Sequence, residues 1–308
     1  MRIAHFTDLH ITEKPSNIAW RDLLSKRFLG WVNLSVRRFH VFRDAAVVTR
    51  ALVRDLEQLK PDHLVSTGDL TGMSLDSEFE KARDALGPLL EHPRVTGIPG
   101  NHDVYVKAAD NGRVYEQYFG RWTRTDLAPE DFPEAFRPVY PYPLVRFLNE
   151  DVVLLFLRDV HARALHDSSG EVRELQLRTL EHLLTEERIA GRQKILALHY
   201  GLCRADGSPD GRLHGLRDAA ALISVARNAG VSLVIHGHLH GRFVLRASDK
   251  FSLTIANPGS VTSKHHDRAY HVITIDQGRI AVEARRYDEA SQRFVAWPEA
   301  PGTGVVHP

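Results

Sequence analysis

The chain has 308 residues, 43% hydrophobic and 26% charged, and its formal net charge of only +1 argues against a general polyanion-binding protein. The amino terminus lacks the basic and apolar regions of a signal peptide, and no apolar run approaches the ~20 residues needed to span a bilayer. Cys203 is the only cysteine, so no internal disulfide can form, and we expect a soluble cytoplasmic protein.

Short strands alternate with amphipathic helices along the first 240 residues. Apolar, β-branched runs predict strands, and apolar residues at three- and four-residue spacing predict the helices between them. The predicted strands of this part are 2–6, 63–67, 94–98, 152–157, 194–198 and 231–235. The predicted helices include 45–59, 177–184 and 217–229. Four further strands are expected at 242–247, 252–256, 270–275 and 279–285. This order predicts an α/β core extended by antiparallel strands.

Two long inserts interrupt the alternation, at 13–43 and 105–143. The first carries tryptophans among basic residues, and the second is rich in aromatic residues. Long inserts in compact domains often serve as lids or interfaces, but their aromatic residues could equally form small cores of their own. The first insert could also lie on a membrane surface. We treat 1–297 as a single domain and expect 298–308 to be a flexible tail.

Polar residues follow five of the predicted strands at the point where each strand ends. They are Asp8 with His10, Asp69, Asn101 with His102 and Asp103, His199, and the alternating His236, His238 and His240 of the stretch VIHGHLHG. Ligands of open α/β sheets bind at the carboxyl ends of the strands. We therefore expect these side chains to meet in one site.

The donors in this set are carboxylate and amide oxygens and imidazole nitrogens, without a thiolate. Such donors suit Mn, Fe or Zn better than Cu(I) or an iron–sulfur cluster. Even seven ligands drawn from this set, two Asp, one Asn and four His, are too many for one tetrahedral zinc ion. They suit two metal ions that share a bridging carboxylate. Two ions ~3.5–4 Å apart stabilise both the attacking and the leaving oxygens of an in-line phosphoryl displacement.

The five blocks D-x-H, G-D, G-N-H-D, H and G-H-x-H, in this order between residues 8 and 240, resemble those of the calcineurin-like metallophosphoesterase superfamily. The resemblance implies a four-layer α/β/β/α sandwich of two mixed β-sheets flanked by helices. It also implies a dinuclear centre of Mn, Fe or Zn ions at the carboxyl ends of the strands.

The same resemblance implies a role for each residue of the blocks. One metal ion would be bound by Asp8, His10 and His240, and the other by Asn101, His199 and His238, with Asp69 bridging the two. His236 lies outside the G-H-x-H block and is expected to be a neighbour of the site. A metal-bound hydroxide would attack phosphorus while His102 protonates the leaving group, and Asp103 would orient His102.

The second and third blocks narrow the range of expected substrates. Phosphoprotein phosphatases of this superfamily carry G-D-x-x-D-R-G and N-H-E, whereas this chain has Gly68-Asp69-Leu70-Thr71 and Asn-His-Asp. These residues look more like those of bacterial class III cyclic-nucleotide phosphodiesterases and broad-specificity phosphodiesterases. The long first insert, and Tyr200 where a second histidine often follows His199, depart from that pattern. We predict a phosphodiesterase, with cyclic nucleotides as one candidate substrate.

Other functions remain open on the same site, namely a phosphomonoesterase, a nuclease or a phospholipid-headgroup diesterase. A mononuclear zinc hydrolase of the metallo-β-lactamase type would need H-x-H-x-D-H in one run, which the chain lacks. A non-catalytic scaffold would be expected to have lost ligands, whereas every block is complete. We expect a small phosphodiester as the partner and no general nucleic-acid binding. Membrane-surface contact through 13–43 and a homodimer are both allowed.

Overall fold

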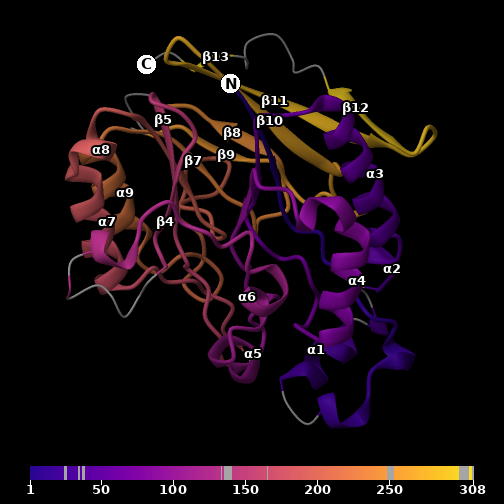
Figure 1. The fold of residues 1–308 in the computed structure, drawn as a ribbon. Coiled ribbons are helices and arrows are strands. Elements are labelled where there is room, and N and C mark those ends of the chain that lie inside the picture. Colours follow the sequence, from indigo (N-terminus) through magenta and orange to yellow (C-terminus); the bar gives the residue numbers. More distant parts are fainter. Residues whose placement is uncertain are drawn as a thin grey trace.

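Two β-sheets pack face to face, and helices cover both outer faces (Figure 1). The structure is a computed structural model that describes the chain except for residues 24–25, 34, 37–38, 133, 135–140, 165, 248–252, 298–304 and 307–308. The predicted α/β/β/α sandwich of two mixed sheets is confirmed.

The first sheet has the strand order β12-β11-β10-β1-β2-β3, with β13 paired to β11. Its strands are β1 (Arg2–Phe6), β2 (His63–Ser66), β3 (Val95–Gly97), β10 (Ala269–Asp276), β11 (Arg279–Asp288), β12 (Arg293–Trp297) and β13 (Val305–Val306). β1, β2 and β3 run parallel, and the remaining pairs are antiparallel. The three parallel strands therefore place their carboxyl ends side by side.

The second sheet has the order β4-β5-β6-β7-β9-β8. Its strands are β4 (Leu144–Phe147), β5 (Val152–Phe156), β6 (Gln193–Ala197), β7 (Val231–Ile235), β8 (Phe243–Leu245) and β9 (Ile255–Asn257). β5, β6, β7 and β9 are parallel, and the edge strands β4 and β8 are antiparallel to their neighbours. This sheet also brings several carboxyl ends together.

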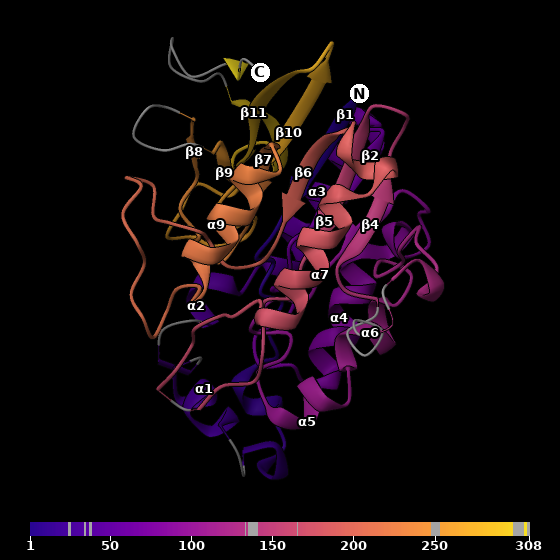
Figure 2. The same cartoon turned by 90° about the vertical axis from the view of Figure 1, so that its left-hand side faces the viewer.

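The helices divide between the two outer faces. α3 (Ala45–Leu59) and α4 (Asp76–Leu86) pack on the first sheet. α7 (Glu174–Thr185), α8 (Glu187–Ala190) and α9 (Ala219–Asn228) pack on the second sheet. In Figure 2, α7 and α9 lie in front of the strands of this sheet. The short helices α1 (Arg27–Asn33), α2 (Phe39–Phe42), α5 (Lys107–Asn111) and α6 (Val114–Phe119) belong to the two inserts.

Three apolar layers hold the four structural layers together. Strand residues alternate between faces, so Val153 and Leu155 of β5 pack toward the helices while Leu154 and Phe156 pack between the sheets. On the other side, Phe6 of β1 packs with the buried face of α3 and α4. The apolar residues that recur at regular spacing in the sequence are therefore the residues that are buried in these layers.

Three of the described strands, β4, β12 and the two-residue β13, were not predicted from the sequence. β4 follows the proline-rich end of the second insert, and β12 is an edge strand with only one buried residue, Phe294. Arg146 interrupts the apolar run of β4, and β12 has the apolar run Phe294–Trp297 but buries little of it. Most of the expected flexible tail, 298–308, lies outside the described residues, and Val305–Val306 pair with β11.

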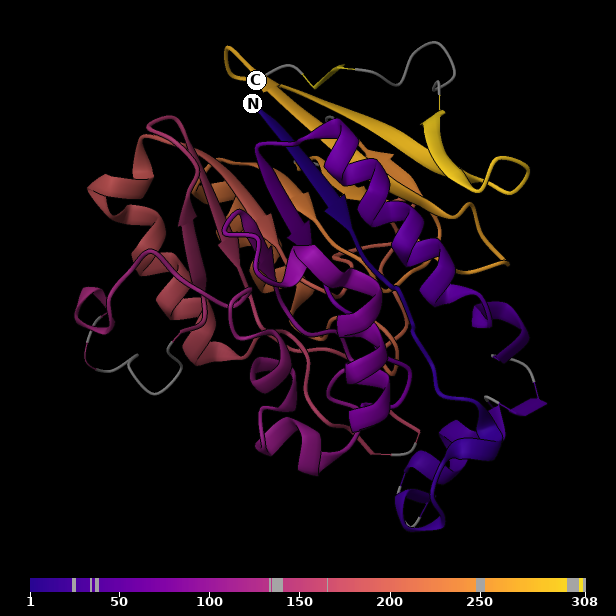
Figure 3. The ribbon, with the colours of Figure 1, turned by 45° about the vertical axis from the view of Figure 1, so that its right-hand side comes forward.

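The two inserts differ in how they pack. In the second insert, Tyr115, Phe119 and Trp122 are buried in the main core of the first sheet and form no separate small core, whereas Tyr105 lines a cavity. The part of the first insert that contains α1 lies beyond the sheets at the lower right of Figure 3, whereas Val41 and Phe42 of α2 pack in the core of the first sheet. Among the residues that the structure describes, no helix has both the length and the apolar character needed to cross a membrane.

Glu78 ties the first insert to the loop that follows β2. Its buried carboxylate accepts hydrogen bonds from the main-chain N–H groups of Met73 (2.7 Å), Leu75 (3.2 Å) and Glu13 (3.3 Å). The Glu78→Ala variant is expected to lower the free energy of unfolding by about 2–4 kcal/mol, because several buried donors lose their acceptor. Urea unfolding measures this, with Glu80→Ala on the exposed side of α4 as the control. Equal effects of the two substitutions would contradict the assignment.

Candidate metal centre

Five loops leave the carboxyl ends of neighbouring strands and converge at one edge of the sandwich. The strands are β1, β2 and β3 in the first sheet and β6 and β7 in the second. Main-chain hydrogen bonds join the first two loops, from Asp8 N to Gly68 O (3.0 Å) and from His10 N to Asp69 O (2.9 Å). The residues predicted at the strand ends are therefore brought into one cluster.

The backbone at this edge is strained. Five of the seven predicted ligands have positive φ angles: Asp8 (56°), His10 (42°), Asp69 (55°), His238 (67°) and His240 (55°). Such conformations cost energy in non-glycine residues and gather at functional sites. The turn at His238 also ends the alternation of β7, so the three histidines of VIHGHLHG do not share one face.

Glycines allow the second and third loops to touch. Gly68 has a φ of 97°, and a Cβ on it would lie 2.2 Å from Gly100 N. A Cβ on Gly100 would in turn lie 2.2 Å from Asp69 Oδ1. No side chain fits at either position, which explains the glycine of the G-D block and that of the G-N-H-D block.

Asp8, His10 and His240 form the first half of the cluster. The Nε2 atoms of His10 and His240 lie 2.8 Å apart. Asp8 Oδ1 lies 3.4 Å from His10 Nε2 and 3.1 Å from His240 Nε2. Three donor atoms thus converge on one point, as the ligands of a metal ion do.

Asn101, His199 and His238 form the second half. Asn101 Oδ1 lies 3.0 Å from His199 Nε2 and 3.1 Å from His238 Nδ1. Asp69 Oδ2 lies 3.6 Å from His199 Nε2 and also 3.6 Å from His10 Nε2 in the first half. The carboxylate of Asp69 is therefore placed between the two halves.

Main-chain carbonyl groups accept hydrogen bonds from the second ring nitrogen of His199 and of His238. His199 Nδ1 donates to Thr67 O at 2.7 Å, and His238 Nε2 donates to His214 O at 3.1 Å. These bonds leave His199 Nε2 and His238 Nδ1 facing Asn101, which fixes the tautomer of each ring. Sequence reasoning missed both partners, because a main-chain acceptor has no residue signature.

Burial sets the protonation of this site. It lowers the pKa of His199 and of His238, so both rings are neutral near pH 7 and have a lone pair for a metal ion. The nitrogen and oxygen donors suit Mn, Fe or Zn. The residues present therefore fit a dinuclear centre.

His102 adjoins the cluster and lines the cavities beside it. Its main-chain N–H donates to Asp69 Oδ1 at 2.7 Å, and its ring Nδ1 donates to Gly72 O at 2.5 Å. The ring is edge-on to His10, with centroids 4.9 Å apart, and stacks with Tyr105 at 5.6 Å. A carbonyl only accepts, so Nδ1 carries a proton, and Nε2 is the nitrogen that gains or releases the second one.

Asp103 is buried beneath these loops. Its carboxylate accepts from Gly100 N (2.9 Å), Leu70 N (3.2 Å), and both the N–H (2.9 Å) and the hydroxyl (2.9 Å) of Thr71. Burial raises its pKa to about 6. Asp103 therefore joins the loop of Asp69 to the loop of His102, and it positions His102 through the main chain.

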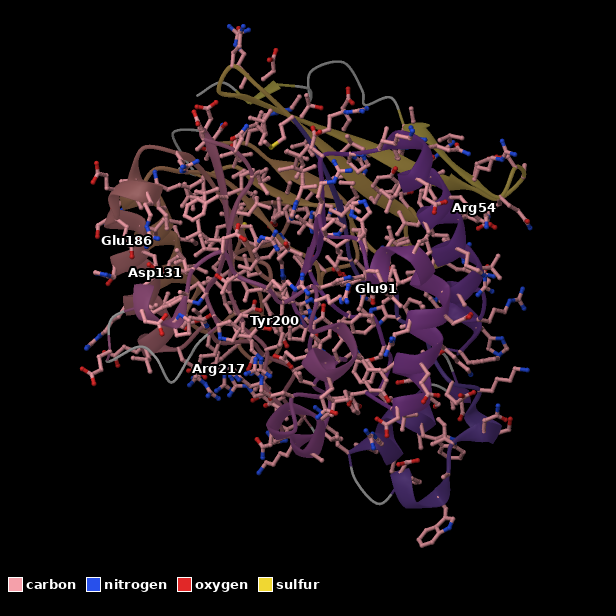
Figure 4. All side chains as sticks on the ribbon, viewed as in Figure 1. Arg54, Glu91, Asp131, Glu186, Tyr200 and Arg217 are labelled. Atoms are coloured by element: carbon pink, nitrogen blue, oxygen red, sulfur yellow. The ribbon has the colours of Figure 1, made fainter. Side chains whose placement is uncertain are left out.

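Asp159 is a residue of this region that sequence reasoning missed. Its buried carboxylate accepts from His199 N (3.1 Å) and Tyr200 N (2.7 Å), and burial raises its pKa to about 7. Asp159 comes shortly after β5, so its position at a strand end was the available signal. Tyr200 lies in the interior of the molecule (Figure 4), with its ring 4.2 Å from that of His238.

His236 is not among the converging donors. It is fully buried, its Nδ1 lies 2.8 Å from Gly237 O, and its ring lies 5.5 Å from that of Phe243. Burial lowers its pKa to about 4, which keeps it neutral. It is a neighbour of the metal centre and takes no place among the converging donors.

Two cavities adjoin the cluster. The larger, about 360 Å³, is lined by Val41, Phe42, Asp69, Asn101, His102, Ser168, His214, His238, His240, Ser263, His265 and His266. The smaller, about 230 Å³, is lined by Lys26, Asn101, His102, Val104, Tyr105, His161, Arg163, His166, Asp167, Ser168 and Tyr200. Both share Asn101, His102 and Ser168, so a bound group at His102 has space on two sides.

Residues 1–242 match a family model described as calcineurin-like phosphoesterase. Among solved structures, the chain is similar to a dimetal phosphatase from Danio rerio, at 14% identity and a TM-score of 0.63, covering 96% of this chain and 98% of that chain. It is also similar to GAP50, the anchor in the inner membrane complex of Plasmodium, at 11% identity and a TM-score of 0.53, covering 98% and 90%. At these identities the likeness shows the fold alone. No curated protein matches the chain significantly.

Proposed function

The chain belongs to the calcineurin-like phosphoesterase family, and from this premise we propose that it is a two-metal phosphodiesterase. One observation carries the proposal: Asp69 Oδ2 lies 3.6 Å from both His10 Nε2 and His199 Nε2, between two groups of converging donors. A carboxylate in that position serves two cations at once.

Each half of the cluster would hold one ion. Asp8, His10 and His240 form one set of ligands and Asn101, His199 and His238 form the other, with Asp69 shared. When bound, the two cations stabilise the charge of the phosphoryl transition state and lower the pKa of the attacking water. Thr67 and His214 keep the second set oriented through their carbonyl groups.

His102 would deliver a proton to the departing oxygen. Its Nδ1–H is held by Gly72 O, so the ring presents Nε2 as the titrating nitrogen. His102 lines both cavities, and it therefore stands where the two substituents of a diester would separate. Proton donation to a leaving group typically contributes about 10²–10⁴ in rate.

The charge of the larger cavity favours a diester over a monoester. Among the described residues that line it, histidines and small polar side chains predominate, and neither Lys nor Arg occurs. A monoester dianion carries one more negative charge than a diester and gains more from a cationic side chain. The lack of the phosphatase arginine in the G-D block supports the same choice.

A substrate screen tests this proposal. The protein loaded with Mn²⁺ is expected to hydrolyse bis(p-nitrophenyl) phosphate with a kcat/KM at least about tenfold above that for p-nitrophenyl phosphate, a difference of about 1.4 kcal/mol. Cyclic AMP, cyclic GMP, glycerophosphodiesters and single-stranded DNA complete the screen. A preference for the monoester would contradict the proposed diesterase and leave the metal centre intact.

A second candidate is a substrate whose leaving group is itself negatively charged, such as a nucleoside-diphosphate sugar. The smaller cavity carries Lys26 and Arg163 beside His102. Lys26 Nζ lies 3.4 Å from Arg163 O and 4.8 Å from the centroid of the Tyr105 ring, and burial lowers its pKa. These cations would face a phosphate on the departing group.

The Lys26→Met variant is expected to lower kcat/KM for a nucleoside-diphosphate sugar by about tenfold or more, because it removes a charge-assisted contact. Hydrolysis of bis(p-nitrophenyl) phosphate, with its uncharged aryl group, should change less than about twofold. Lys107→Met, at an exposed position of α5, is the matched control. Equal losses on the two substrates would remove Lys26 from substrate selection.

A further inference from the structure

Exposed apolar side chains are concentrated in the first insert. Nine large hydrophobic residues are exposed among those the structure describes, and five of them lie between residues 20 and 36. They are Trp20 (74% exposed), Phe28 (48%), Leu29 (49%), Val32 (38%) and Val36 (69%). Exposed apolar side chains gathered in one segment mark a candidate site of interaction with a protein or a membrane.

Helix α1 has two opposite faces. Arg27 donates to Met73 O (3.0 Å) and Ser74 O (2.6 Å), and a Cβ on Gly30 would lie 2.7 Å from Met73 Sδ. These two residues therefore face the body of the protein. At about 100° per residue, Phe28, Leu29 and Val32 lie on the other face of the helix and point outward.

The first insert also carries a higher net positive charge than the chain as a whole. Residues 13–43 contain seven Lys and Arg residues against Glu13 and Asp22, a formal net charge of +5, whereas the whole chain has only +1. A short amphipathic helix with exposed Phe and Leu, and an exposed Trp in the same basic segment, has the composition that binds the surface of an anionic bilayer. A second copy of the chain would bring two +5 segments together, so charge disfavours self-association.

The position of the insert connects this surface to the cavities. Lys26 lines the smaller cavity, and Val41 and Phe42 line the larger one. The insert projects from the molecule beyond the sheets, at the end where α1 and α5 lie (Figure 1). A surface that contacts the first insert would therefore lie close to residues that line both cavities.

We propose that the exposed apolar side chains of the first insert, namely Trp20, Phe28, Leu29, Val32 and Val36, dock the protein on an anionic lipid surface. The apolar side chains enter the headgroup region while the basic residues of the insert contact anionic headgroups. Arg27 and Gly30 hold the helix in place for this contact. The proposal is independent of the substrate that the metal centre hydrolyses.

Vesicle flotation tests the proposal with the full chain. The wild-type protein is expected to float with vesicles of phosphatidylcholine containing phosphatidylglycerol at about one third, and at least tenfold less with phosphatidylcholine alone. The double variant Trp20→Ser, Leu29→Ser should lose about tenfold or more of the binding to anionic vesicles. Leu175→Ser, Val295→Ser, which removes two exposed apolar side chains of α7 and β12, is the matched control.

Thermal unfolding and hydrolysis of bis(p-nitrophenyl) phosphate should be the same for both double variants and the wild type. Failure of the wild-type protein to float with anionic vesicles would overturn the proposal. So would an equal loss in the control variant. A wild-type dimer in sedimentation that becomes a monomer only with Trp20→Ser, Leu29→Ser would assign the face to a second copy instead.

Discussion

Replacement of Asp69 by alanine is expected to remove at least one metal ion per chain and to lower kcat for bis(p-nitrophenyl) phosphate by more than about 10³-fold. Asp69 Oδ2 lies 3.6 Å from a donor nitrogen of each half of the cluster. At ~4 Å, a pair of unit charges near a protein surface interacts by about 4 kcal/mol. Loss of the shared carboxylate therefore weakens both metal sites and removes negative charge that offsets the repulsion between the two cations.

The fold should survive this substitution. Asp69 lies in a loop at the edge of the sandwich, and the three apolar layers lie between the sheets and under the helices. Circular dichroism and thermal unfolding of the metal-free variant check that point. Asp151→Ala, which removes an exposed carboxylate of the turn before β5, is the control for a lost charge. Turnover at the wild-type rate in Asp69→Ala would rule out the dinuclear assignment.

Replacement of His102 by alanine is expected to affect substrates according to their leaving groups. An alkoxide such as ribose oxygen is a strong base and needs a proton to depart, whereas p-nitrophenolate leaves readily without one. The loss in kcat should be about 10²–10⁴ for a cyclic or alkyl diester, or about 3–5 kcal/mol of barrier. For bis(p-nitrophenyl) phosphate the loss should be much smaller.

Metal content separates the acid role of His102 from an effect on the metal centre. The ring is held by Gly72 O and stacks with Tyr105. One donor atom of His102 also lies within 4.8 Å of donor atoms of His10 and Asp69, but the seven predicted ligands are other residues. The variant should therefore keep both metal ions. Equal losses on the two substrates at full metal occupancy would exclude His102 as the acid and leave the metal centre in place.

The sequence predicted the central strands because burial on both faces leaves a continuous apolar run. β5 and β7 lie within one residue of their expected bounds, and the carboxyl ends of β1, β2, β3, β6 and β7 bring the predicted donors together. β12 escaped prediction although Phe294 to Trp297 are apolar, and in the folded chain only Phe294 of its five residues is buried. The residues that follow the central strands therefore predicted the site reliably, whereas the strands at the edges of the sheets were not predicted reliably.

The contacts that orient the site could not be read from the sequence. Thr67 and His214 act through carbonyl groups, and Gly72 does the same for His102, so only the folded backbone identifies them. Asp103 was expected to orient His102, and the structure shows it bonded to the main chain of two loops. The aromatic residues of the second insert posed the same difficulty, because burial of Tyr115 and Trp122 depends on tertiary packing.

Metal analysis of the protein purified without chelators tests the central claim most directly. Two sets of converging donors with Asp69 between them predict about two ions of Mn, Fe or Zn per wild-type chain, and about one or fewer in Asp69→Ala. Removal of the metal with a chelator should abolish hydrolysis, and adding back Mn²⁺ should restore it. About one ion or none per wild-type chain, with activity unchanged by the chelator, would contradict the dinuclear account.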